Sequence, residues 1–153
     1  MRRSSGHRAI MFEIHTPLIP IYLARVEPPP KQPDEELQAG EDPVTVYYTG
    51  DEDPGPCKVA IAYLYMLEDR TAGSARIRNP ALHVKIISLG LKQLSELKPA
   101  EKFDVIYIVG LSKDSLLRLL NLLRLEASEG GRKVCSQREL EEVTASRAMR
   151  LKL

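Results

Sequence analysis

The segment from residue 103 to the carboxyl end constrains the fold more than any other part of the chain. Residues 103–110 (Phe-Asp-Val-Ile-Tyr-Ile-Val-Gly) form an almost continuous apolar run, which is typical of a central parallel strand buried on both faces. Ser112 can cap a helix that we expect to end at Gly130-Gly131. A short strand at 132–135 and a helix over 137–152 complete a β-α-β-α order, which predicts a parallel sheet with right-handed crossovers.

Strand patterns also fill the amino-terminal part of the chain. Residues 8–14 and 18–26 are rich in β-formers, and Thr16-Pro17 between them predicts a turn and hence a β-hairpin. Pro20 has no amide hydrogen, which favours an edge position for the second of these strands. Residues 44–49 predict a further strand that ends at Gly50.

Two helices are expected in the middle of the chain. Residues 58–67 fit either a strand or a helix, and we favour a helix closed by Gly73. Asn79-Pro80 combines a cap residue with proline at the first helical position, which predicts a helix over 80–97 stopped by Pro99.

Length and composition place these elements in one domain. The chain has 153 residues and is 43% hydrophobic and 28% charged, which suits a single folded domain of residues 1–153. Residues 28–43 are acidic, contain prolines and lack an apolar period, so we expect a loop there. The predicted fold class is α/β, with a small mixed or parallel sheet, helices on both faces and an amino-terminal β-hairpin.

A leucine-rich segment is the strongest feature of the predicted helix after Ser112. Seven leucines lie between positions 116 and 125, and Arg118, Asn121 and Arg124 form one narrow polar stripe. A helix with one wet face needs an apolar arc of only about 100°, so this wider arc predicts cover on two sides. The second cover is either the chain itself or a partner, such as another copy. The candidate interface residues are Leu116, Leu117, Leu119, Leu120 and Leu123.

Charge excludes some partners and leaves others open. The formal net charge of +1 excludes a bulk polyanion binder, which is expected to be strongly basic. Local basic clusters still permit nucleic-acid contact, and Tyr47, Tyr48, Tyr63 and Tyr65 could stack on bases if exposed. The candidate nucleic-acid contacts are Arg76, Arg78, Lys85, Arg147, Arg150 and Lys152.

The sequence also predicts where the protein is found. No apolar run reaches the roughly 18–20 residues that cross a bilayer, and the basic amino end does not resemble a secretory signal. We therefore expect a soluble, cytoplasmic protein without membrane partners.

Asn occurs only twice and Gln four times, which is typical of thermophile proteins. Cys57 and Cys135 lack metal-ligand spacing, and we expect two unrelated thiols, although a disulfide is admissible in a hyperthermophile.

Candidate chemistry is sparse. The loop over residues 50–58 resembles a phosphate loop, but Pro54 and Pro56 remove amides and its carboxylates repel anions. The same acids could instead bind a hard cation, although a solvated turn is the preferred interpretation.

A ligand site at strand ends would use Thr49, Gly50, Gly110 and Ser112. His7, His15 and His83 are scattered, with His83 expected on an exposed helix face beside Lys85, and we assign no catalytic residue, metal or cofactor.

Two functional hypotheses follow. The first is a non-catalytic accessory or interaction protein that assembles with itself or another protein through the leucine-rich helix and touches nucleic acid through its basic termini. The alternative is a small enzyme or a nucleotide or ligand sensor with a Rossmann-like site, which requires Thr49, Gly50, Gly110 and Ser112 to converge on one cleft.

Overall fold

The computed structural model describes residues 8–27, 42–73, 77–92, 94–97 and 103–151. The predicted acidic loop at 28–43 lies almost entirely outside these residues. The strands are β1 (Arg8–His15), β2 (Pro20–Glu27), β3 (Val44–Tyr48), β4 (Val105–Gly110) and β5 (Ala127–Val134). The helices are α1 (Pro56–Thr71), α2 (Pro80–Leu89), α3 (Lys113–Leu122) and α4 (Gln137–Leu151), with single 3-10 turns at Gly50–Glu52 and Leu94–Glu96. Among the described residues, no helix has the length and apolar character needed to cross a membrane.

The five strands form one mixed sheet in the order β3-β4-β2-β1-β5. β1 and β2 pair antiparallel as the predicted hairpin, and β4 pairs antiparallel with both β2 and β3. Only β1 and β5 pair in parallel. The predicted α/β class with a mixed sheet and an amino-terminal hairpin is therefore confirmed.

β4 is buried along its whole length, as its apolar run predicted. The expectation that it lies between parallel strands is wrong, because both of its neighbours run antiparallel to it. β5, the next strand in the chain, does run in the same direction as β4. The β1–β2 hairpin lies between them, however, so β5 reaches the sheet only at its far edge.

The edge position predicted for β2 from Pro20 is also wrong. β2 is the middle strand of the five. Pro20 is its first residue and lies opposite His15 of β1, whereas the pairing of β2 with β4 extends from Tyr22 to Val26. The missing amide therefore falls outside the ladder with β4, and a proline at the first position of a strand is tolerated.

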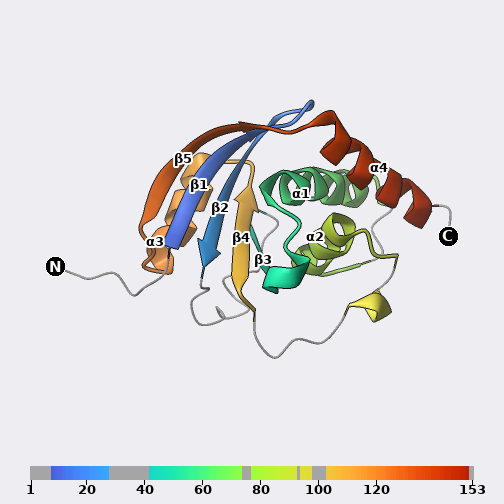
Figure 1. The fold of residues 1–153 in the computed structure, drawn as a ribbon, viewed down its shortest axis with the longest axis horizontal. Helices are drawn as coiled ribbons and strands as arrows, with labels where there is room; N and C mark the ends of the chain where they lie inside the picture. Colours follow the sequence, from blue (N-terminus) through green and yellow to red (C-terminus); the bar gives the residue numbers. More distant parts are fainter. Residues whose placement is uncertain (1–7, 28–41, 74–76, 93, 98–102, 152–153) are drawn as a thin grey trace.

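Helices cover both faces of the sheet, with α3 on one side and α1, α2 and α4 on the other (Figure 1). The side chains of β4 alternate between these layers: Tyr107 belongs to the core beneath α1 and α2, and Ile106 and Ile108 belong to the core beneath α3. Burial on both faces explains why β4 is apolar at every position.

The leucines of α3 mostly face the chain's own sheet. Leu116, Leu119 and Leu120 are buried against it, and Leu123 packs partly against the same core. Leu117 and Leu122 stay 37% and 64% exposed, on opposite flanks of the helix. Three of the five candidate interface residues are therefore buried within one chain, but only on the side of the sheet, and the second cover that the wide apolar arc predicts is not supplied at Leu117 and Leu122.

α3 ends at Leu122, well before the predicted stop at Gly130-Gly131. Both glycines instead belong to β5, where the register with β1 shifts between Met11 and Phe12. Gly130 is the extra residue of this bulge, and a Cβ on it would lie 2.5 Å from a carbon of the Phe12 ring. Glycine avoids this clash, and a larger residue would have to displace the Phe12 ring.

The two central helices differ in how well the sequence placed their ends. α1 contains all of residues 58–67, which confirms the helical interpretation of that ambiguous segment. α2 begins after the Asn79 cap as expected but ends at Leu89, not at residue 97. Gly90 adopts φ 72° and its amide donates back to the last turn, so the helix closes with a left-handed glycine. Pro99 lies outside the described residues.

Cys57 and Cys135 form a disulfide with a Cα–Cα distance of 5.5 Å. The prediction of two unrelated thiols is therefore wrong. The two cysteines are 78 positions apart, and only the folded chain brings the first turn of α1 beside the residue after β5. The bond fixes the carboxyl end of β5 to the helical layer.

We expect the double variant Cys57→Ser/Cys135→Ser to lose stability, because a cross-link across so long a loop restricts the unfolded chain. The free energy of unfolding should fall by about 4 kcal/mol, measured by urea denaturation. A reductant should lower the stability of the wild-type protein by a similar amount and leave the variant unchanged. Wild-type unfolding that is insensitive to reductant would contradict the bond.

The burial of α3 makes a second prediction. Leu116→Ala removes a fully buried side chain and should cost about 3 kcal/mol in the free energy of unfolding. Leu117→Ala, the neighbouring change on the helix flank, should cost less than about 1 kcal/mol. Equal costs in urea denaturation would show that the helix is covered differently.

Candidate functional site

The four residues of the predicted ligand site do not lie together. β3 and β4 run antiparallel, with Tyr48 opposite Val105 and Val44 opposite Val109. Thr49 and Gly50 therefore lie at the start of β4, and Gly110 and Ser112 lie at its other end, roughly 17 Å away at about 3.4 Å per residue. Antiparallel pairing excludes the single cleft that the Rossmann-like hypothesis requires of these four positions.

The turn after β4 already holds a carboxylate of the same chain. Oδ1 of Asp42 accepts a hydrogen bond of 2.7 Å from the Leu111 amide, and a Cβ on Gly110 would lie 2.1 Å from that oxygen. The Ser112 hydroxyl accepts from the Ser115 amide at 3.2 Å, as in an ordinary helix cap. Asp42 thus occupies part of the predicted ligand site.

At the start of β4, Asp53 joins three segments of the chain. It accepts hydrogen bonds of 2.6 Å from the Tyr107 hydroxyl and 2.6 Å from the Arg25 guanidinium, and one of 3.0 Å from the Gly55 amide. Burial by itself would raise the pKa of Asp53, but the bonds from Tyr107, Arg25 and Gly55 outweigh burial and lower it. Burial and the neighbouring carboxylate raise the pKa of Tyr107. This cluster ties the turn before α1 to β2 and β4.

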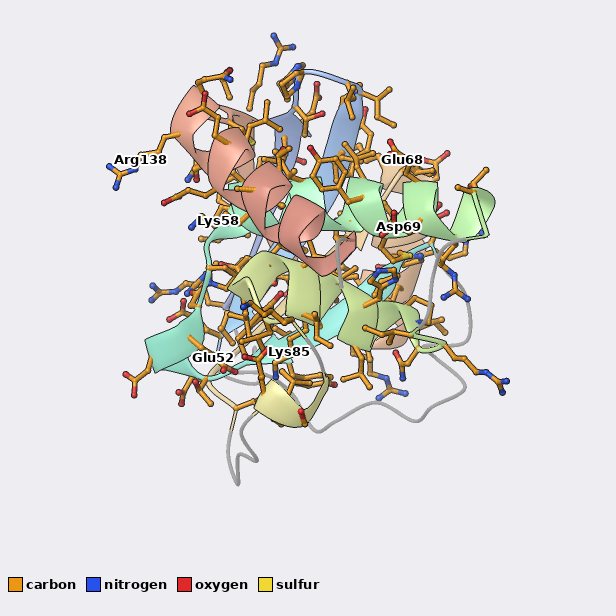
Figure 2. The ribbon with its side chains drawn as sticks, turned by 90° about the vertical axis from the view of Figure 1, so that its right-hand side faces the viewer. Glu52, Lys58, Glu68, Asp69, Lys85 and Arg138 are labelled. Carbon is orange, nitrogen blue, oxygen red and sulfur yellow. A yellow bond between two sulfur atoms is a disulfide. The ribbon has the colours of Figure 1, made fainter. Side chains whose placement is uncertain are left out.

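The Lys85 side chain contacts residues of its own chain at this end of the sheet (Figure 2). Its Nζ lies 3.4 Å from Oε1 of Glu52 and 4.8 Å from the centre of the Phe103 ring. The Glu52 side chain in turn accepts a bond from the Thr49 amide at 3.1 Å. Lys85, a candidate nucleic-acid contact, is therefore mostly covered by its own chain.

The acidic loop at 51–53 does not form a cation site. Both carboxylate oxygens of Asp53 are engaged by Tyr107 and Arg25. Across the described part of the chain, no group of three His, Cys, Asp or Glu side chains is placed to hold a metal ion. The solvated-turn interpretation fits exposed Asp51 but not Asp53, whose side chain is 16% exposed and bonded within the fold.

Of the remaining nucleic-acid candidates, the structure describes the side chain of Arg78 alone. Arg78 is exposed, whereas Arg76, Lys152 and the side chains of Arg147 and Arg150 lie outside the described residues. Tyr48, Tyr63 and Tyr65 are buried, and burial raises the pKa of half-covered Tyr47 to about 12. These buried rings cannot stack on an external base.

His83 was expected on an exposed helix face, and this is wrong. It is 4% exposed, and its Nε2 lies 3.4 Å from a carboxylate oxygen of Asp69. α2 packs against α1, so the face that carries His83 meets α1 and not solvent.

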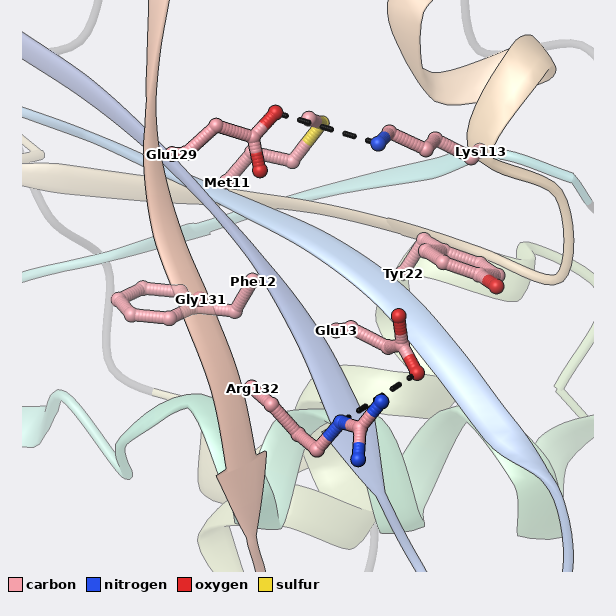
Figure 3. A pocket seen from close by; sticks show the side chains of 8 residues that line it. All are labelled: Met11, Phe12, Glu13, Tyr22, Lys113, Glu129, Gly131 and Arg132. Carbon is pink, nitrogen blue, oxygen red and sulfur yellow. Dashed lines mark ion pairs between the residues drawn. The ribbon is translucent and has the colours of Figure 1, made fainter.

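A polar pocket lies open on the α3 side of β1, β2 and β5 (Figure 3). Its volume is about 200 Å³. The ladder places Tyr22, Glu13 and Arg132 in one row across three strands. The neighbouring row contains Met11, which belongs to the core beneath α3. α3 begins only at Lys113, so it covers the Met11 row and leaves the next row open.

Two long ion pairs border this pocket. Lys113 and Glu129 are 3.9 Å apart, as are Arg132 and Glu13, and Figure 3 shows both pairs at the pocket. Nε2 of His15 lies 2.6 Å from Oε2 of Glu13. Exposed pairs of this length contribute little stability, so these charges remain available to a partner.

Sequence reasoning missed this row because its members lie far apart in the chain. A local signal did exist: Glu13 lies in the predicted strand at 8–14 and His15 follows it directly, and residues two apart in a strand lie on the same face. Arg132 could not be assigned to them, because the sequence does not show that β5 pairs with β1.

Comparison of the chain with protein-family models, curated proteins and solved structures gave no match.

The Asp53 cluster predicts a pH-dependent contribution to stability. Asp53→Asn should lower the free energy of unfolding by about 2 kcal/mol at neutral pH, because Arg25 and Tyr107 lose their charged acceptor. The folded-state pKa of Asp53 lies below its unfolded value of about 3.9, so the difference from wild type is complete above that pH and is lost as the pH falls through the folded pKa. Urea denaturation from pH 7 to pH 3 measures it, with exposed Asp51→Asn as the control. A difference that does not shrink in acid would contradict the assignment.

Proposed function

We propose that this protein is a non-catalytic accessory protein that contacts a macromolecular partner through one corner of its sheet. The observation that carries the proposal is a group of exposed apolar side chains at the β1–β2 turn and the end of β5. Leu18, Ile19 and Val134 are 62%, 44% and 75% exposed. We call these three residues the hairpin corner.

The ladder brings the members of the hairpin corner to one end of the sheet. Val134 lies opposite His15, and His15 lies opposite Pro20, the residue after Ile19. Large apolar side chains gathered in water are unfavourable unless a partner covers them, so such groups mark contact surfaces.

The turn that carries Leu18 and Ile19 is held in place by Thr16. Its hydroxyl accepts from the amides of both residues at 3.2 Å and donates to the Ile19 carbonyl at 2.7 Å. A surface that is already ordered loses less conformational entropy on binding. Arg132, Lys133 and His15 lie beside the apolar residues, which gives the apolar centre and charged surround typical of protein contacts.

The ionisable groups inside the molecule support a non-catalytic role. Arg25 and Asp53 join β2 to the turn before α1, and His83 and Asp69 join two helices. Each pair connects elements of the fold, so its chemistry is used to hold the structure together.

A small polar ligand is the second candidate, in line with the sensor hypothesis but at a different site. The pocket beside Glu13 presents Lys113 and Arg132 for an anionic group and Glu13 and Glu129 for a cationic one. This arrangement favours a ligand that carries both charges. Titration calorimetry with free amino acids would test it.

Other parts of the first hypothesis remain proposals. On α3, Leu117 and Leu122 are exposed and available to a partner. Nucleic-acid contact through the basic ends would weaken steeply as the salt concentration rises. A cytoplasmic location in a thermophile would agree with the disulfide, since intracellular proteins of hyperthermophiles are rich in such bonds.

The hairpin corner can be tested by affinity purification from the native cell, followed by mass spectrometry of bound protein and nucleic acid. We expect the wild-type protein to retain a partner and the variant Leu18→Asp/Val134→Asp to lose it, because burying a carboxylate at the contact is costly. Leu122→Asp, on α3, is the matched comparison: it should retain the partner, and loss of the partner in this variant alone would place the contact on α3 and not at the hairpin corner. A wild-type protein that is recovered alone and monomeric would refute the proposal.

A further inference from the structure

β5 is an edge strand that helices leave uncovered on both faces. Its first residue is half-buried, and the other seven are exposed. One side pairs with β1, and β5 is last in the strand order. Among the described residues no strand pairs with its outer side, so the backbone amides and carbonyls there can pair with another strand.

The bulge sets the spacing of the side chains along this edge. In the ladder with β1, Glu129 and Gly131 take neighbouring positions, and Gly130 is the extra residue between them. Gly131 is thus the middle of seven ladder positions that extend from Ala127 to Val134.

A second β5 can pair antiparallel about a two-fold axis at Gly131. Two-fold symmetry places residues at equal ladder distances from Gly131 opposite each other. Glu129 then lies opposite Arg132 of the second copy. The outer positions match Ser128 with Lys133 and Ala127 with Val134.

In this register, side chains of opposite charge meet on the α3 side of the sheet. Glu129 lies opposite Met11 and Arg132 opposite Glu13 of β1, and all four line the pocket on the α3 side. Directly opposite residues of antiparallel strands point to the same face, where unlike charges attract and like charges repel. Each dimer contains this Glu–Arg contact twice, and glycine at the axis lets the two backbones approach.

The same charges disfavour pairing of this edge with other strands. Charged side chains and bulges are the usual means of preventing indiscriminate edge pairing. Glu129, Arg132 and Lys133 would be left opposite unmatched residues in most other pairings, whereas a second copy satisfies the first two.

From this pattern, we propose that the protein forms a two-fold dimer in which the β5 edges of two copies pair antiparallel about Gly131. The sheet then extends through both molecules, and the pocket beside Glu13 receives Glu129 and Arg132 of the second copy at its border. The inference rests on the proposed accessory function and names the occupant of this edge.

Charge exchange tests the register. Glu129→Arg alone and Arg132→Glu alone each place like charges opposite each other, so each should raise the dimer dissociation constant at least about tenfold. An equimolar mixture of the two variants pairs arginines with glutamates and should form a heterodimer. The double variant Glu129→Arg/Arg132→Glu should again form a homodimer. Sedimentation equilibrium at low ionic strength, where charges are weakly screened, measures each species.

The controls separate folding from association. Side chains of Glu129 and Arg132 are 71% and 69% exposed, so circular dichroism should show that both variants fold. Glu126→Arg and Arg138→Glu reverse exposed charges outside β5 and should leave the dissociation constant unchanged.

Three results would overturn the inference: a monomeric wild-type protein at high concentration, single variants that still dimerise, or single variants that the mixture does not rescue. A monomer that still retains a partner through the hairpin corner would overturn only the dimer. A monomer recovered without any partner would overturn the accessory function as well.

Discussion

The antiparallel pairing of β4 with both of its neighbours is the constraint on which the rest of the structure depends. Because β4 is buried on both faces, a helical layer must lie on each side of it. Because β3 runs against it, the polar residues after β3 meet the beginning of β4 and not its end. The Asp53 cluster bonds to Tyr107, which belongs to the core beneath α1 and α2, whereas the open pocket lies on the α3 side, so the two sites form on opposite faces of the sheet.

The disulfide explains how an uncovered strand is held at the sheet edge. β5 gains little from burial, since seven of its eight residues are exposed. Its end is instead fixed by the bond between Cys135 and Cys57, and α4 beyond it packs on α1 with Lys58 and Glu142 3.1 Å apart. Anchoring at one end leaves the outer edge of β5 open without requiring a helix over it.

The sequence predicted what depends on local chemistry. The hairpin, the burial of β4, the Asn79 cap and the character of α1 follow from period, turn residues and caps, and all are confirmed. The strand order, the disulfide and the row that joins Glu13 to Arg132 depend on contacts between distant segments, which local patterns do not specify. The glycines at 130 and 131 misled for the same reason: they resemble a helix stop, and only the approach of Phe12 shows that they belong to a bulge.

The bulge links the open pocket to the edge of the sheet. By inserting Gly130, it brings Glu129 and Arg132, three apart in the chain, to the same face of β5, although regular alternation would place them on opposite faces. Both charges consequently line the pocket and, on the same strand, stand at equal ladder distances from Gly131. Without the extra residue the strand would lose both the pocket's paired charges and the two-fold symmetry of its edge. A single backbone irregularity therefore determines both features.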